Sequence, residues 1–135
     1  MASIFTKIIN GTIPSYKIAE TEAYYAFLDI NPLMQGHTLV VPKKEVDYIF
    51  DLDEKTFEGL MRFSKKIAHA IEAVVPCNRI SIAVVGLEVP HAHVHLVPIN
   101  AMADMDFKKP RVQMTRAEFT ALAQEINAKF DALND

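Results

Sequence analysis

Short runs of apolar and β-branched residues, bounded by turn-forming residues, predict several strands. In the first half of the chain they are Lys17–Glu20, Tyr24–Leu28 and Thr38–Val41. In the second half, Arg79–Val85 and His91–Pro98 follow the same pattern. Polar and apolar side chains alternate from residue 91 onwards, so a strand there has two different faces.

Three further segments carry apolar residues at helical spacing. The longest repeats its apolar positions from Phe57 to Val75 and ends at Pro76. A short helix is expected over residues 4–9 and a closing helix after residue 115. Each has a capping residue in front of it: Ser3, Asp53 and Thr115, the last in a capping box with Glu118. Strands with few helices between them predict an α+β fold, with a largely antiparallel sheet covered by helices.

Composition narrows the class of protein. With 135 residues and 50% hydrophobic content, the chain is expected to form one domain over residues 1–135 with a proper core. The 14 basic and 17 acidic residues argue against a nucleic-acid-binding protein but allow a small anionic ligand in a locally positive pocket. The single cysteine, Cys77, excludes an intramolecular disulfide and a Cys-paired zinc site. No targeting or membrane segment is visible, so the cytoplasm is the expected compartment.

Three of the five histidines, His91, His93 and His95, occupy alternate positions. On a strand this spacing directs the three imidazoles to one face, while the intervening apolar side chains point into the core. Crowded imidazoles resist being charged together, so one of them is expected to be neutral near pH 7. A neutral imidazole can act as a nucleophile and a charged neighbour can stabilise an anionic oxygen, which suits attack on phosphorus.

A metal site is the alternative interpretation of the same residues. Neighbouring histidines on one face can share a zinc or iron ion, usually with a further ligand. His37 and Glu88 are the obvious candidates for that ligand. From the residue types alone, phosphorus chemistry and a metal site are about equally supported.

The segment His91–Val97 resembles the signature of the histidine-triad (HIT) family, His-φ-His-φ-His-φ-φ, where φ is apolar. The resemblance extends through Ile4–Gly11, Ala26–Pro32 and Gly36–Lys44 and is strongest to the Hint-like branch. It covers a core of about residues 4–100, while the loop and helix over 101–135 match less specifically. It implies a HIT-like fold in which the antiparallel sheet packs against one long helix and a C-terminal helix.

The resemblance also implies an activity, nucleotide hydrolysis or transfer. In this scheme His93 attacks the α-phosphorus, His91 and His95 hold the phosphate oxygens and orient it, and His37 supports the site. Asp29 would accept the ribose hydroxyls. The remaining expected nucleotide-binding residues are Phe5, Ile8, Phe27, Ile30, Glu88 and Val89. A purine nucleotide ligand and a homodimer follow from the same resemblance, and no cofactor is expected. The charge balance and the lack of a long apolar segment leave neither a nucleic acid nor a membrane as an expected partner.

The chain departs from the family pattern at several positions. Many relatives carry a Cys-x-x-Cys and a later histidine that bind structural zinc, and here those positions hold Ser3, Thr6 and Glu45, so we expect no structural metal. Leu87 stands where many relatives have glutamine. Glu88 could protonate a leaving amine or repel a polyphosphate.

Nucleoside 5′-phosphoramidates, or related AMP and GMP conjugates, are therefore the expected substrates. Three alternatives stay open from the sequence. One is a dinucleoside polyphosphate hydrolase of the Fhit-like kind. Another is a non-catalytic dimer that binds nucleotides or a protein, and a weaker one is a metalloenzyme.

Overall fold

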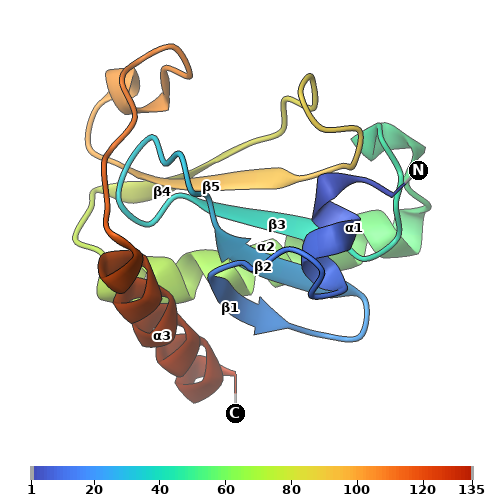
Figure 1. Ribbon diagram of the computed structural model, residues 1–135, viewed down its shortest axis with the longest axis horizontal. Coiled ribbons are helices and arrows are strands. Elements are labelled where there is room, and N and C mark those ends of the chain that lie inside the picture. Colours follow the sequence, from blue (N-terminus) through green and yellow to red (C-terminus); the bar gives the residue numbers. More distant parts are fainter. Residues whose placement is uncertain (1, 135) are drawn as a thin grey trace.

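The computed structural model describes residues 2–134, and within them one sheet of five strands forms the centre of the molecule (Figure 1). The strands lie in the order β1-β2-β3-β5-β4, and every neighbouring pair is antiparallel. Their bounds are β1 Lys17–Glu20, β2 Tyr24–Leu28, β3 Thr38–Pro42, β4 Arg79–Ala83 and β5 Val94–Ile99. The predicted α+β class with an antiparallel sheet is confirmed.

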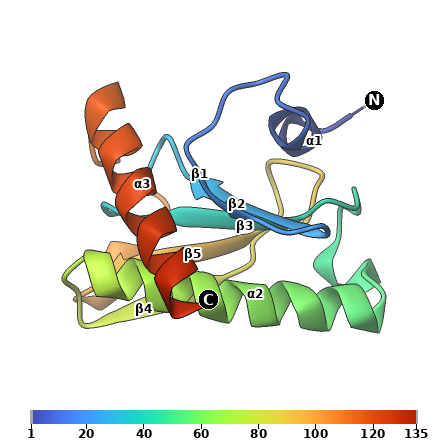
Figure 2. The same cartoon turned by 90° about the horizontal axis from the view of Figure 1, so that it is seen from below.

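Helices cover both faces of this sheet, as Figure 2 shows for α1 and α2. The helices are α1 Ile4–Ile9, α2 Glu54–Val74 and α3 Arg116–Leu133. The predicted caps are confirmed, because Ser3, Asp53 and Thr115 each accept a hydrogen bond from an amide in the first turn of their helix. The third helix packs against α2 and β1. None of the helices among the described residues combines the length and apolar character that a membrane crossing requires.

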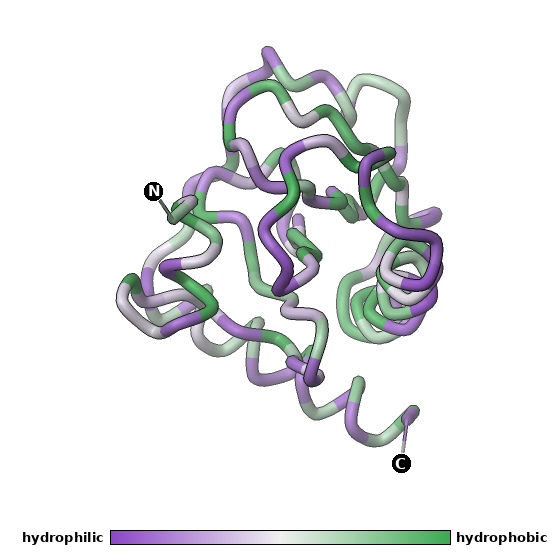
Figure 3. Tube along the Cα trace, turned by 90° about the vertical axis from the view of Figure 1, so that its right-hand side faces the viewer, coloured by the Kyte–Doolittle hydropathy of each residue, from purple (hydrophilic) through white to green (hydrophobic). Residues whose placement is uncertain are grey.

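The alternation of side chains along the strands creates two separate apolar clusters, one on each face of the sheet. On the side of α2 and α3, Val40, Val94 and Leu96 are buried in the larger cluster. On the side of α1, a smaller cluster contains Phe5, Ile8, Tyr25, Phe27, Leu39 and Val41. Figure 3 shows hydrophobic and hydrophilic residues alternating around the helical turns, as expected for helices with one buried side.

The ladder of β5 is shorter than the strand predicted over 91–98. It begins at Val94, because the residues before it bond to loops instead of to β3: the His91 amide donates to Val89 O and the Ala92 amide to Val46 O. Likewise β4 ends at Ala83 and not at Val85, since Ala83 opposite His95 is the last paired position. The apolar-inward alternation of residues 92, 94 and 96 is nevertheless confirmed.

Two short 3-10 helices were not predicted. One covers Ile49–Asp51 and the other Met102–Met105. The second turns the segment that was expected to be an irregular loop, and Asp104 stabilises it by accepting the amides of Asn100 and Ala101. After this turn the chain returns towards the sheet, where the Phe107 ring contacts His95.

Candidate active site

A cleft of about 520 Å³ opens on the α1 side of the sheet. One part of its wall is apolar and comes from α1, β2 and β3, including Phe5, Phe27 and Leu39. The other part is polar and includes His93 and His95. Of the residues predicted from the sequence, the cleft brings together His93, His95, Asp29, Phe5, Ile8, Phe27, Ile30, Glu88 and Val89.

The middle histidine, His93, is fixed by its own chain. Its Nδ1 lies 2.8 Å from the carbonyl oxygen of His91, and a carbonyl only accepts, so the ring proton is on Nδ1. Its Nε2 is then unprotonated. Nε2 of His93 has no hydrogen-bond partner among residues 2–134, and the only side-chain nitrogen or oxygen atom there that is both buried and without a partner is Ser64 Oγ. Nε2 of His93 is therefore not buried but accessible from the cleft.

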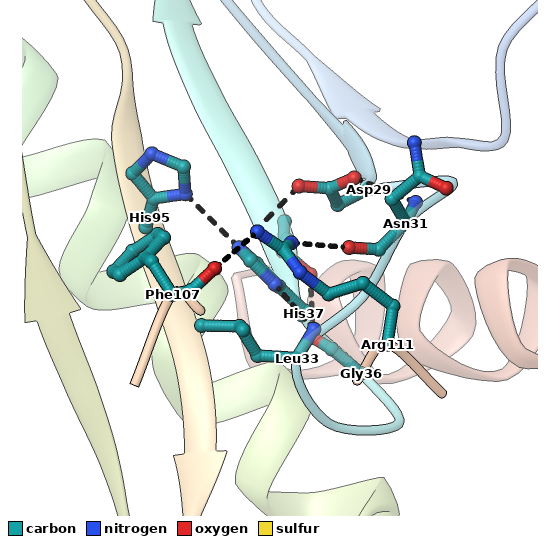
Figure 4. A network of polar contacts seen from close by, with 9 residues as sticks. Asp29, Asn31, Leu33, Gly36, His37, His95, Phe107 and Arg111 are labelled. Carbon is teal, nitrogen blue, oxygen red and sulfur yellow. Dashed lines mark hydrogen bonds and ion pairs between the residues drawn. The ribbon is translucent and has the colours of Figure 1, made fainter. Parts of the chain in front are cut away.

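His95 is linked to His37, which lies behind the cleft on the loop before β3 (Figure 4). The Leu33 amide donates to Nδ1 of His37 at 3.0 Å, which places the proton of the neutral His37 ring on Nε2. That Nε2–H faces Nδ1 of His95 at 3.0 Å and donates to it. The proton of a neutral His95 is consequently on Nε2, so His93 offers a lone pair and His95 an N–H to the same cleft.

Burial, more than mutual repulsion, keeps these rings neutral. It lowers the pKa of His37 to about 3 and that of His95 to about 4, with nearby positive groups adding to the effect. Burial also lowers the pKa of His93. From the sequence, one member of the triad was expected to be neutral beside a charged neighbour, whereas His37, His93 and His95 are all neutral at pH 7 and supply hydrogen bonds without charge.

His91 differs from the other two members of the triad. It is fully buried, and its Nε2–H donates to Pro42 O at 2.8 Å while Nδ1 meets Ser3 Oγ at 2.7 Å. It does not line the cleft. The expectation that its ring holds phosphate oxygens is therefore not supported by this geometry, because both ring nitrogens already contact protein groups. Its carbonyl, however, orients His93.

Asp29 lies at the end of β2, where the sequence places it. Its Oδ1 accepts the Asn31 amide at 2.8 Å, and its Oδ2 lies 3.6 Å from Nε2 of His37. Burial raises the pKa of Asp29 despite the opposing hydrogen bond. Oδ2 thus remains free of a short protein hydrogen bond, and Asp29 lines the cleft together with Ile30 and Asn31.

Two residues of the cleft, Phe107 and Arg111, were missed by the sequence analysis. The Phe107 ring packs edge-on against His95, with 5.1 Å between the ring centroids. Arg111 donates to Asn31 O at 2.7 Å and to Phe107 O at 3.0 Å, which ties the loop after β2 to the segment after β5 (Figure 4). An aromatic residue and an arginine that follow the triad in the sequence are only a weak indication of a binding site. Phe107 and Arg111 reach the cleft because the 3-10 helix at 102–105 turns the chain.

The only group of described residues that could hold a metal ion consists of Asp29, His37 and His95, whose ligand atoms lie within 4.8 Å of one another. The hydrogen bond from Leu33 counts against such a site. It requires the lone pair on Nδ1 of His37 and leaves the proton on Nε2, the atom that would face the ion. This arrangement fits a pair of hydrogen-bonded imidazoles better than a metal centre.

Comparison with known proteins gives a consistent result. The HIT domain family model matches residues 10–102. An uncharacterised HIT-like protein of Borreliella burgdorferi is 36% identical over 92% of this chain and 95% of its own length. Adenosine 5′-monophosphoramidase hnt1 of Schizosaccharomyces pombe is 35% identical over 96% of this chain and 98% of its own.

Among solved structures, a Zn-bound histidine triad family protein from Mycobacterium smegmatis has a TM-score of 0.85 at 27% identity. The match covers 99% of this chain and 96% of that one. The likeness therefore extends over the sheet, the cleft and the C-terminal helix. The sequence and structural matches agree, and the chain belongs to the HIT family.

Proposed function

We propose that this protein is a nucleotide hydrolase that cleaves nucleoside 5′-phosphoramidates, or related AMP and GMP conjugates, through a nucleotidyl-histidine intermediate on His93. The observation that carries the proposal is the protonation pattern of the cleft. An accessible, unprotonated Nε2 of His93 lies beside a His95 whose Nε2–H is free to donate. A nucleophile and a hydrogen-bond donor for the phosphate are the two groups that substitution at phosphorus needs.

In the first step, Nε2 of His93 attacks the α-phosphorus, and the bond from phosphorus to the leaving nitrogen breaks. The leaving amine takes up a proton, for which Glu88 at the cleft rim is the candidate donor. During the attack the His91 carbonyl stabilises the positive charge that develops on the His93 ring. In the second step, water attacks phosphorus and gives a proton to the Glu88 carboxylate, the bond to Nε2 breaks, and the nucleoside monophosphate leaves.

The nucleoside occupies the rest of the cleft in this proposal. The Asp29 carboxylate accepts hydrogen bonds from the two ribose hydroxyls, since each of its two oxygens can accept one such bond. The base packs against the apolar wall of the cleft, which includes Phe5 and Ile8 from α1, Phe27 from β2 and the loop residue Ile30. The wall suits the flat, largely apolar faces of a purine.

The charges of the cleft favour a substrate with one phosphate over a polyphosphate. Arg111 is the only lysine or arginine that lines it within the described residues, and it is opposed by the carboxylate of Asp29. A tri- or tetraphosphate chain would bring more negative charge than one guanidinium can balance. The 35% identical S. pombe relative, an adenosine 5′-monophosphoramidase, supports the same choice.

The test compares initial rates on an adenosine 5′-phosphoramidate and on a diadenosine polyphosphate. We expect the phosphoramidate to be hydrolysed with the higher kcat/KM, and His93→Ala to abolish turnover while AMP binding is retained. His69→Ala is the matched control, because His69 is exposed and pairs only with Glu72. A His93→Ala variant with normal rates would refute the mechanism, and tight AMP binding without turnover on either substrate would favour the non-catalytic alternative.

We also propose that the chain acts as a homodimer. The edge strand β4 supports this, because Ile82 is 50% exposed on it and Val85 just beyond it is equally exposed. They border an apolar groove of about 460 Å³ that also contains Tyr48 and Phe50. Such an uncovered apolar edge is typical of an interface. Sedimentation should give a dimer that Ile82→Lys converts to a monomer.

A further inference from the structure

The N-terminus of α1, the loop after β3 and the first histidine of the triad meet in one polar cluster outside the cleft. We call it the clamp, and it consists of Ser3, Thr6, Glu45 and His91. Ser3 Oγ lies 2.7 Å from Nδ1 of His91 and accepts the Thr6 amide at 3.0 Å. Glu45 Oε1 accepts the Ser3 amide at 2.7 Å and the Thr6 hydroxyl at 2.6 Å.

The hydrogens of the clamp can be assigned without leaving a mismatch. In the neutral ring, His91 places its proton on Nε2, where it donates to Pro42 O at 2.8 Å. Nδ1 then has a lone pair for the Ser3 hydroxyl, and the Thr6 hydroxyl donates to Glu45. Ser3 and His91 are 7% and 0% exposed, so the bond between them is shielded from water, whereas the bond from Thr6 to Glu45 lies at the surface. A buried hydrogen bond whose two members are both fully paired fixes a single arrangement.

Three of them, Ser3, Thr6 and Glu45, are also the positions at which the family resemblance implies a structural zinc in other members, and the side chains here do not fit that ion. Zinc sites of that kind rely on thiolate and imidazole ligands. Two of the four groups are neutral hydroxyls, and the lone pairs of Glu45 Oε1 and His91 Nδ1 already accept hydrogen bonds within the cluster. In this cluster, hydrogen bonds and not a metal ion join the N-terminus of α1, the loop after β3 and the first histidine of the triad.

A single hydrogen bond connects the clamp to the nucleophile, His93. The carbonyl of His91 accepts Nδ1–H of His93 at 2.8 Å, so the position of residue 91 sets the tautomer and tilt of residue 93. Phe5, in the first turn of the same α1, packs edge-on against both rings at 5.8 and 4.9 Å between centroids. We propose that the clamp is a metal-free positioning device that holds His93 as the Nδ1–H tautomer with Nε2 free for phosphorus.

The experiment removes the centre of the clamp with Ser3→Ala and observes His93 directly. In ¹⁵N-histidine-labelled protein, two-bond ¹H–¹⁵N spectra assign the tautomer of each imidazole. We expect His93 to be the Nδ1–H tautomer in the wild type and a mixture of tautomers in Ser3→Ala. A shift of this catalytic ring by a fraction of an ångström to 1 Å should lower kcat by about 10- to 100-fold, with Kd for AMP changed less than about threefold because the clamp lies outside the cleft.

Thr115→Ala is the matched control, since Thr115 caps α3 in the same way but does not line the cleft. It should lower Tm to a similar degree without moving the His93 signals or kcat. A triple variant, Ser3→Cys, Thr6→Cys and Glu45→His, should bind one zinc per chain, recover kcat when loaded and lose it in chelator. The wild type should be indifferent to chelator.

Two results would overturn the positioning role: unchanged His93 signals in Ser3→Ala, or a wild type that carries zinc and loses activity when it is removed. The kinetic part rests on the proposed function, whereas the tautomer measurement does not. If the wild type hydrolyses no phosphoramidate, the proposed function fails while the spectra still decide whether the clamp sets the His93 tautomer.

Discussion

At the His91 end of the triad both ring nitrogens contact protein groups, whereas at the His95 end Nε2 stays open to the cleft. The two residues have the same type and equivalent places in an alternating pattern, but their surroundings give them different chemistry. His91 faces the capping serine of α1, and His95 faces His37 and the Phe107 ring. The partner that each ring meets determines whether it holds the backbone or can meet a substrate.

The largest expected difference between the two ends is in catalysis. His95→Ala removes the N–H that we assign to the phosphate oxygens, and loss of one such donor typically costs about 10²- to 10³-fold in kcat. The measurement is single-turnover cleavage of an adenosine phosphoramidate. The concentration of the variant is determined beforehand, and the variant is shown to be folded at the assay temperature. A His95→Ala variant with kcat within about fivefold of the wild type would show that His95 is not that donor.

Stability should show the opposite order. His91→Ala removes two buried hydrogen bonds and leaves a cavity in a region with no exposure, so we expect the free energy of unfolding to fall by about 3 kcal/mol. His95→Ala should cost less, about 1–2 kcal/mol, because its ring borders the cleft and water can replace part of it. Urea denaturation of both variants tests this order, and equal losses would contradict it.

The buried pair at the His95 end also predicts a pH dependence of stability. The pKa values of His37 and His95 fall from 6.5 to about 3 and about 4 on folding, so below about pH 6.5 the unfolded chain binds more protons than the folded one. The free energy of unfolding should therefore decrease as the pH falls, by up to about 1.4 kcal/mol per pH unit for each histidine, and the loss attributable to His95 ends near pH 4.

Asp29 acts in the opposite direction near the acid end of this range, since its raised pKa lets the folded state bind a proton earlier than the unfolded chain. Urea titrations from pH 7 to pH 4.5 measure the net slope. His37→Asn should make the slope shallower, and His69→Ala, at an exposed site, should leave it unchanged. A stability that is flat over this range would mean that the two rings are not buried as neutral groups.

The sequence alone predicts the elements of the fold and most of the cleft, but not the different roles of His91 and His95. Alternation and caps predicted the strands, the helices and most of the cleft wall, because burial of one face follows directly from side-chain periodicity. The roles of His91 and His95 depend on contacts across long sequence separations, such as Ser3 with His91. No local pattern encodes such a contact. Phe107 and Arg111 were missed for the same reason, since a short 3-10 turn decides where they lie.

Substitution of Arg111 should have the smallest effect, and it tests most directly how the His95 end of the cleft binds its ligand. The neutral imidazoles bring no charge to the cleft, so the negative phosphate depends on this guanidinium for electrostatic balance. Two of its five N–H donors hold Asn31 O and Phe107 O, and the other three remain for a ligand. Arg111→Gln should raise KM for the phosphoramidate about tenfold, or about 1.4 kcal/mol, and change kcat less.

Lys108→Gln is the control for charge on the same segment, because Lys108 is exposed and does not line the cleft. Arg111→Lys separates charge from shape: it keeps the positive charge but cannot hold both carbonyls in the same plane. If the charge matters most, Arg111→Lys should lie closer to the wild type than to Arg111→Gln. If the tie between Asn31 and Phe107 matters most, the two substitutions should be equally damaging. Equal effects of Lys108→Gln and Arg111→Gln would show that only the net charge of the segment, and not a site in the cleft, attracts the substrate.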